Sequence, residues 1–198
     1  MIIADGGAGT LLYAGKISDL CFNEAGEAII TKGDYVEIYG LVSPYNGLYE
    51  VKPQTITKPD PVADAAKIAL IQEPVFSSYT PKQINDGGIG LTGNLAEVSG
   101  LKLVATDDKK SLADELSALS TGSHWTLTAV DADGNKIPIY VNYHIGADAQ
   151  TAIKTLLTGL TATDTFTFKG MISAYNKKQL TPLDFGGEGG AAACFIKN

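Results

Sequence analysis

The chain contains two similar thirteen-residue segments, 130 residues apart, and this repeat strongly limits the folds that it can adopt. The segment DYVEIYGLVSPYN, which begins at Asp34, is matched by DTFTFKGMISAYN, which begins at Asp164. Five of these thirteen positions are identical: Asp34 and Asp164, Gly40 and Gly170, Ser43 and Ser173, Tyr45 and Tyr175, Asn46 and Asn176. A repeated pattern of this kind predicts two related structural units.

Each occurrence predicts a β-hairpin. Apolar residues occupy every second position, which is typical of a strand with one buried face: Val36, Ile38 and Val42, then Phe166, Phe168 and Ile172. Asn46-Gly47 follows the first strand and favours a type I′ turn, because both residues accept a positive φ. Asn176-Lys177 is a weaker version of that turn. Second strands are expected over residues 48–51 and 179–181.

The rest of the second half can be put in order. The faint echo of Ala4-Asp5-Gly6 in Ala132-Asp133-Gly134 predicts a tight turn between two strands in each half. The expected elements are a first strand over 89–95 that continues toward 101–105, a helix over 111–120, strands over 125–130 and 136–143, a helix capped by Asp148 that ends at Gly159, and the repeated hairpin. The core order is therefore strand, strand, strand, helix, strand, strand.

This order resembles the OB-fold, a five-stranded Greek-key barrel. The resemblance is carried by Ile89–Ala105, Trp125–Tyr143, Ala147–Gly159 and Thr165–Thr181; in the first half, by Ile2–Tyr13 and Tyr35–Ile56. The phrases IIADGGAGTLLY and GDYVEIYGLVSPYNGLYEV are similar to those of uncharacterised OB-like envelope proteins of Gram-negative anaerobes. The resemblance implies a mainly β fold with minor α, made of two tandem barrels, and an extracytoplasmic location in the periplasm or at the cell surface.

The Pro- and Asp-containing stretch 57–64 reads as a linker, which predicts an N-terminal OB-like module over 1–64 and a C-terminal one over 65–198. The first module is expected to lack its N-terminal strand, because nothing in this sequence precedes Ile2, and residues 16–32 are a poor helix. A barrel without one strand has an open edge. Three alternatives could close it: a segment upstream of Met1, the tail Ala191–Asn198, or a second chain, which would mean self-association through that edge.

Charge and composition count against nucleic acid as a partner without excluding it. The net charge is −7, and all 15 basic residues are lysines. An acidic chain without arginine is a poor candidate for tight nucleic-acid binding, because that affinity depends on cationic contacts to phosphate. Residues 1–64 contain four lysines and nine acidic residues, a net charge of −5. Residues 65–198 contain eleven lysines and thirteen acidic residues, a net charge of −2. The sequence predicts no membrane span and shows no signal peptide.

Motifs of catalysis and cofactor binding are not found. His124 and His144 read as polar residues at strand ends, and Asp131-x-Asp133-Gly134-Asn135 lacks the glutamate that would complete a calcium loop. Cys21 and Cys194 have no metal-ligand spacing; a disulfide is one alternative, and two buried thiols are the favoured one. We therefore expect a protein that is not an enzyme and has no cofactor or metal.

The candidate ligand-binding residues are aromatic side chains and nearby lysines, because OB barrels use aromatic rings as stacking platforms. They are Trp125, Tyr140, Tyr143, Lys169, Tyr175, Lys177 and Lys178 in the second module, and Tyr35, Tyr39 and Tyr45, with Tyr13 and Tyr49, in the first. Tyr35 and Tyr39 should point away from the core, opposite Val36 and Ile38. An alternative for Tyr45 and Tyr175 is packing over a barrel end.

Three function classes compete. The expectation is a non-catalytic interaction module of the cell envelope that binds a protein or a polysaccharide. The alternative is a single-stranded nucleic-acid-binding protein, which has the fold and the tyrosines but the wrong charge. An enzyme is the third class, and no group of residues in the sequence supports it.

Overall fold

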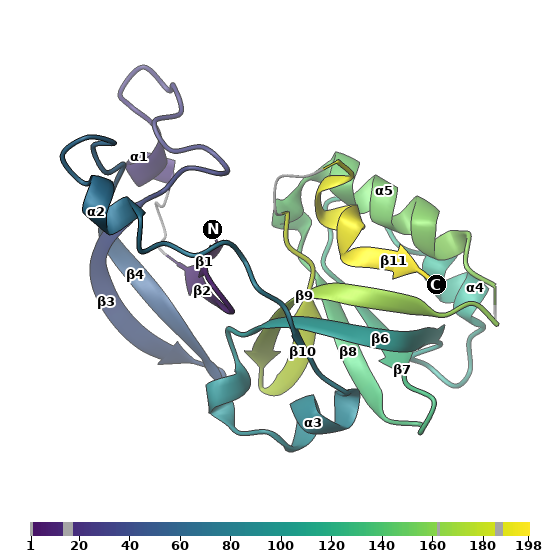
Figure 1. Ribbon diagram of the computed structural model, residues 1–198. Coiled ribbons are helices and arrows are strands. Elements are labelled where there is room, and N and C mark those ends of the chain that lie inside the picture. The colour runs from purple at the N-terminus through teal and green to yellow at the C-terminus, as the bar shows by residue number, and fades with distance from the viewer. Residues whose placement is uncertain (1, 14–17, 162, 185–187) are drawn as a thin grey trace.

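The computed structural model describes residues 2–13, 18–161, 163–184 and 188–198, and shows a mainly β protein with two sheets (Figure 1). The first sheet consists of β1 (Ile2–Asp5), β2 (Ala8–Leu12), β3 (Glu37–Tyr45) and β4 (Leu48–Thr57), in the order β1-β2-β4-β3. Neighbouring strands are antiparallel, except that β2 and β4 are parallel, with Leu11 opposite Glu50. The helices α1 (Ser18–Cys21) and α2 (Ala65–Ile68) lie beyond the same end of this sheet in Figure 1.

The second sheet closes into a five-stranded barrel. Its strands are β6 (Leu95–Val104), β7 (Trp125–Val130), β8 (Lys136–Val141), β9 (Phe166–Tyr175) and β10 (Lys177–Thr181). Around the barrel they run β6-β7-β8-β10-β9, and β9 pairs back onto β6. Only β8 and β10 are parallel among these pairs, with Ile139 opposite Leu180. The predicted order, with a helix between the third and fourth strands, is confirmed by α5 (Ala147–Thr158).

Shorter elements surround the barrel. They are β5 (Ser77–Ser78), α3 (Pro81–Asp86), η1 (Ile89–Leu91), α4 (Leu112–Ser117), η2 (Tyr143–Ile145), η3 (Gly190–Cys194) and β11 (Phe195–Lys197). Local sequence explains where α3 and α4 begin. Before α3, the Thr80 hydroxyl accepts a hydrogen bond from the backbone N–H of Gln83 at 3.2 Å; before α4, the Ser111 hydroxyl accepts one from the backbone N–H of Asp114 at 3.1 Å. These are N-caps, which satisfy the free backbone donors of a first helical turn.

The cores of the two sheets differ greatly in size. In the barrel, alternate residues of the strands point inward, and Phe166, Phe168 and Ile172 are fully buried together with the inner face of α5. In the first sheet, the buried cluster contains only Leu12, Cys21 and Ile56, with partly buried residues around it. The favoured expectation for the cysteines is confirmed, because Cys21 and Cys194 are free and buried in separate clusters.

Some expectations need correction. The first strand was expected over 89–95, but Ile89–Leu91 form a 3₁₀ turn and β6 begins at Leu95, after Gly93 with φ of 94°. The cap of α5 is Gly146, and Asp148 lies in the first helical turn. The tail does not close the first sheet: β11 pairs with β9, where Phe195 packs against Phe166 and Phe168.

Other expectations stay predictions. Of the stretch 16–32, residues 18–32 are described and contain only the four-residue α1; residues 16 and 17 lie outside the described part. The module boundary near residue 64 falls between β4 and α2 and stays a prediction. None of the helices in the described ranges has the length and apolar character to cross a membrane.

The first sheet and part of the barrel share one strand arrangement. The order β1-β2-β4-β3 corresponds to β7-β8-β10-β9, with the same pattern of antiparallel, parallel and antiparallel pairs. The repeated phrase lies on β3 in the first sheet and on β9 in the barrel. The strand β6 has no counterpart in the first sheet among the described residues.

Candidate ligand-binding surface

The tips of the two repeated hairpins meet. The backbone N–H of Asn176 donates a hydrogen bond to the carbonyl oxygen of Asn46 at 2.9 Å, and the rings of Tyr45 and Tyr175 lie 6.3 Å apart. Both asparagines have a positive φ, 47° at Asn46 and 61° at Asn176. Asparagine tolerates this left-handed conformation better than most residues. The turn chemistry of the sequence therefore places two polar side chains and two aromatic rings at one junction.

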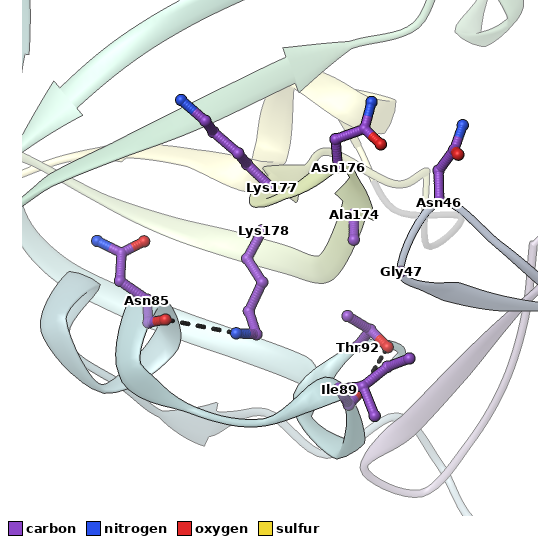
Figure 2. Close-up of a pocket in the computed structure, with 9 residues that line it drawn as sticks. All are labelled: Asn46, Gly47, Asn85, Ile89, Thr92, Ala174, Asn176, Lys177 and Lys178. Atoms are coloured by element: carbon purple, nitrogen blue, oxygen red, sulfur yellow. Dashed lines mark hydrogen bonds between the residues drawn. The ribbon is translucent and has the colours of Figure 1, made fainter.

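A hollow of about 390 Å³ opens beside this junction (Figure 2). It is lined by Asn46, Gly47, Asn85, Ile89, Thr92, Ala174, Asn176, Lys177 and Lys178. The ammonium of Lys178 donates to the carbonyl oxygens of Asn85, at 3.4 Å, and of Gly87. Lys177 points away from this contact, toward the opposite side of the view. The side-chain amides of Asn46 and Asn176 form no hydrogen bond with the described part of the chain, so they are available to a ligand.

A second aromatic group lies where β7 begins and β8 ends. The hydroxyl of Tyr140 is 2.6 Å from Nδ1 of His124, and the two rings stack with centroids 5.4 Å apart. The ring of Tyr143 meets His124 edge-on at 4.7 Å. Burial raises the pKa of Tyr140 above its usual value, and the nearby Tyr143 and Tyr175 raise it further. No ring contact in the described part of the chain joins this group directly to Tyr45 and Tyr175 at the hairpin tips.

We call these five side chains the aromatic strip: Tyr45, Tyr175, Tyr140, His124 and Tyr143. Strand alternation explains why its middle part faces outward. Trp125 and Leu127 of β7 point into the barrel, so His124 lies on the outer side, and Tyr140 of β8 is half-buried there beside it. Tyr45, Tyr143 and Tyr175 are 52%, 38% and 59% exposed, so their rings can contact a ligand.

The structure brings four of the predicted site residues together in two pairs: Tyr45 contacts Tyr175, and Tyr140 and Tyr143 both contact His124. The prediction for Trp125 is corrected: its side chain is only 3% exposed, and its Nε1–H donates to the carbonyl oxygen of Ser120 at 2.8 Å. Trp125 faces the core because it is in phase with Leu127 and Ala129 along β7.

The other predicted tyrosines lie elsewhere. Tyr35 and Tyr39 are exposed and point away from the core, as expected, while Val36 and Ile38 pack against the small cluster of the first sheet. Tyr39 precedes Tyr45 by six residues on β3, a distance of about 20 Å along a strand. Tyr13 and Tyr49 are exposed on the first sheet, and no ring contact within the described ranges joins them to the strip.

The predicted lysines do not form a cationic patch. The ammonium of Lys169 is 2.9 Å from a carboxylate oxygen of Glu97 and 5.8 Å from the ring centroid of Phe76. Lys178 is held by backbone carbonyls. Lys177 is exposed and has no ion-pair partner among the residues that the structure describes. The strip and the hollow beside it therefore combine aromatic rings and amides with one available cation.

Three residues of this surface were not predicted as ligand contacts: His124, Asn46 and Asn176. The outward phase of His124, directly before Trp125, could have indicated its position. Nothing local could have indicated that Asn46 and Asn176 meet, because 130 residues separate them.

The described residues contain no group of three or more His, Cys, Asp or Glu side chains that could hold a metal ion. Asp131 uses its carboxylate within its own turn, where it accepts hydrogen bonds from Asp133 and Asn135. Comparisons with models of protein families, with curated proteins and with solved structures found no match to this chain. The arrangement of residues is thus the basis for any functional proposal.

Proposed function

We propose that the chain contains two OB-fold-like units in tandem, of which the first lacks its first strand. The strand order of the barrel supports the proposal, because β6, β7, β8, α5, β9 and β10 follow the order of a five-stranded OB barrel. The arrangement that β1, β2, β3 and β4 share with β7, β8, β9 and β10 supports the duplication.

On this basis, we propose that the protein is a non-catalytic binding protein of the cell envelope that holds a polysaccharide chain across the aromatic strip. The observation that carries the proposal is the strip itself, whose two aromatic groups lie at the start of β7 and the end of β8 and at the β9–β10 turn, where Tyr175 meets Tyr45 of the first unit. In OB barrels, ligands bind over the second and third strands and the loop between the fourth and fifth. These correspond to β7, β8 and the turn at Asn176.

The chemistry of the strip suits sugar rings. The exposed rings of Tyr143 and Tyr175 offer apolar faces, and the amides of Asn46 and Asn176 offer donors and acceptors for hydroxyl groups. A neutral polymer does not require the phosphate-neutralising cations that this surface lacks. The envelope location rests on the resemblance described from the sequence.

Single-stranded nucleic acid is the second candidate, because nucleobases also stack on aromatic rings. The exposed Lys177 beside Tyr175 favours it. The ion-paired Lys169 and the carbonyl-bound Lys178 count against it, since neither ammonium is free for phosphate.

Affinity electrophoresis and titration calorimetry with purified neutral polysaccharides (mannan, xylan and a mixed-linkage β-glucan) test the proposal. We expect at least one to bind, with an affinity that hardly changes between low and moderate salt. Tyr175→Ala should weaken binding about tenfold, the effect of one lost stacking contact. The matched control is Tyr13→Ala, which removes an exposed tyrosine outside the strip and should leave binding unchanged.

Fluorescence anisotropy with a labelled mixed-sequence single-stranded DNA separates the two candidates. Saturable DNA binding that weakens steeply with salt, and that Tyr175→Ala reduces, would replace polysaccharide with nucleic acid. Binding of neither ligand class, or polysaccharide binding that Tyr175→Ala and Tyr13→Ala leave equal, would contradict a role for the strip.

A further inference from the structure

The outer edge of β3 is unpaired. β3 is the last strand of the first sheet, and within the described ranges no other strand pairs with its free side. At the beginning of this strand, the ammonium of Lys67 on α2 lies 3.5 Å from the carboxylate of Glu37. An edge strand presents backbone N–H and C=O groups that can hydrogen-bond to another extended segment.

The barrel shows what occupies the corresponding edge of β9. There β6 runs antiparallel to β9, with Ala96 opposite Gly170 and Val98 opposite Phe168. The contact spans residues 166–171 of β9, which correspond through the repeated phrase to residues 36–41. Pro44, which has no backbone N–H to donate, lies on β3 beyond this stretch.

The exposure of side chains near this edge differs between the two sheets. Leu41 is 65% exposed, whereas its counterpart Met171 is 1% exposed. Val42 is 68% exposed, whereas its counterpart Ile172 is fully buried. Adjacent aliphatic side chains exposed to this degree on a sheet edge are typical of an interaction surface.

We propose that residues 36–41, which are Val36 and the first half of β3, accept an extended strand from a protein partner, which runs antiparallel to β3. The partner strand is apolar at alternate positions, because Ala96 and Val98 of β6 are buried, while Glu97 between them and Ser99 after them are not. This binding is β-strand addition, in which main-chain hydrogen bonds supply affinity and alternate side chains supply specificity.

Charge identifies the partner as a basic segment. Residues 1–64 contain four lysines and nine acids, a net charge of −5, and Glu37 at the edge has a side chain that is 61% exposed. A second copy of this chain would bring two such modules together, and like charges at an interface disfavour association. A strand with lysine or arginine at its outward positions complements the acidic module.

The probe is a fluorescein-labelled peptide with the sequence of residues 94–105, in which lysine replaces glutamate at the position of Glu97. Anisotropy measured with the full chain should show saturable binding. Leu41→Lys should weaken it about tenfold, because an apolar contact is lost and a like charge added. Leu70→Lys is the matched control: Leu70 is 78% exposed and lies outside β3, so this variant should bind as the unmodified chain does.

Backbone hydrogen exchange locates the peptide, and slower exchange within residues 36–41 is the expected result. Three results would overturn the proposal: no binding, protection confined to β6 and β9, or sedimentation of the chain alone as a dimer that Leu41→Lys dissociates. The proposal is independent of the aromatic strip. Tyr175→Ala should leave peptide binding intact, and Leu41→Lys should leave polysaccharide binding intact.

Discussion

The strands β3 and β9 carry the same phrase and have opposite surroundings. On β9, Phe168 and Ile172 are fully buried, because β6 pairs with β9 and closes the barrel around its core. On β3, Ile38 is half-buried and Val42 is 68% exposed, because no strand in the described part occupies that position. The phrase thus specifies a hairpin and its turn, and the presence of a fifth strand decides how much of that hairpin is buried.

What the two strands retain in common is backbone geometry and capping. Asp34 and Asp164 make equivalent hydrogen bonds. The carboxylate of Asp34 accepts one from the backbone N–H of Thr31 at 2.6 Å, and that of Asp164 accepts one from the backbone N–H of Thr161 at 2.7 Å. Each also pairs with a lysine at the end of a neighbouring strand: Lys58, directly after β4, at 2.7 Å, and Lys197, the last residue of β11, at 2.8 Å. The correspondence therefore reaches Thr31 and Thr161, upstream of the thirteen matched positions.

The largest difference in stability between β9 and β3 is expected when one corresponding aliphatic side chain on each strand is replaced by alanine. Ile172→Ala should lower the free energy of unfolding by about 2–5 kcal/mol, because it leaves a cavity in the barrel core. Val42→Ala, at the corresponding exposed position, should change it by at most about 0.5 kcal/mol. Urea denaturation of both variants checks the comparison, and equal losses would mean that β3 is covered in solution.

A smaller effect is expected at the glycine that both strands share. A Cβ at Gly40 would lie 2.5 Å from the carbonyl oxygen of Lys52, and one at Gly170 would lie 2.5 Å from that of Thr181. Gly40→Ala and Gly170→Ala should each cost about 1–3 kcal/mol, because backbone must shift to admit the methyl group.

The larger cost is expected at Gly170, where the ring of Phe168 is also within 2.6 Å of the added Cβ. Gly90→Ala is the control in the same denaturation experiment, because a Cβ there meets no atom within 4 Å. A Gly40→Ala variant as stable as the unmodified chain would show that the two hairpins do not share this close approach.

The smallest effect on stability is expected from replacing Asp34 and Asp164. Hydrogen bonds from Lys58 lower the pKa of Asp34 to about 2, and those from Lys197 do the same for Asp164. A lowered carboxyl pKa stabilises the fold above the unfolded value of 3.8, and this contribution disappears as the pH falls to about 2.

Asp34→Asn and Asp164→Asn should therefore each reduce stability slightly at neutral pH and not at all near pH 2. Denaturation midpoints at the two pH values provide the measurement. A deficit in either variant that persists in acid would show that its carboxylate charge is not responsible.

Much of the fold could be predicted, because its signals are local. Alternation predicted the strands of both hairpins, and a serine cap predicted α4. The position of the tail on β9 could not be predicted, because Phe195 meets Phe168 only after the barrel has formed. The 3₁₀ turn at Ile89 was not predicted. Its apolar residues indicated a strand, but the glycines on either side of them favour a turn.

The candidate site was predicted in part for the same reason. Tyr140 and Tyr175 could be recognised as aromatic residues of strand and turn, and they lie in the strip. Trp125 was wrongly included, although its phase with Leu127 pointed inward. Lys169 is paired with Glu97, which lies 72 residues earlier in the chain, so local sequence could not reveal that its charge is neutralised.

One repeated hairpin is closed by a fifth strand, and the other is open in the described part of the chain. Native-state hydrogen exchange of the backbone amides in residues 36–41 and 166–171 tests it most directly. Slow exchange is expected throughout residues 166–171, and fast exchange at alternate amides of residues 36–41, those that face away from β4. Uniformly slow exchange over residues 36–41 in the chain alone would contradict it, because some segment would then already occupy the open edge.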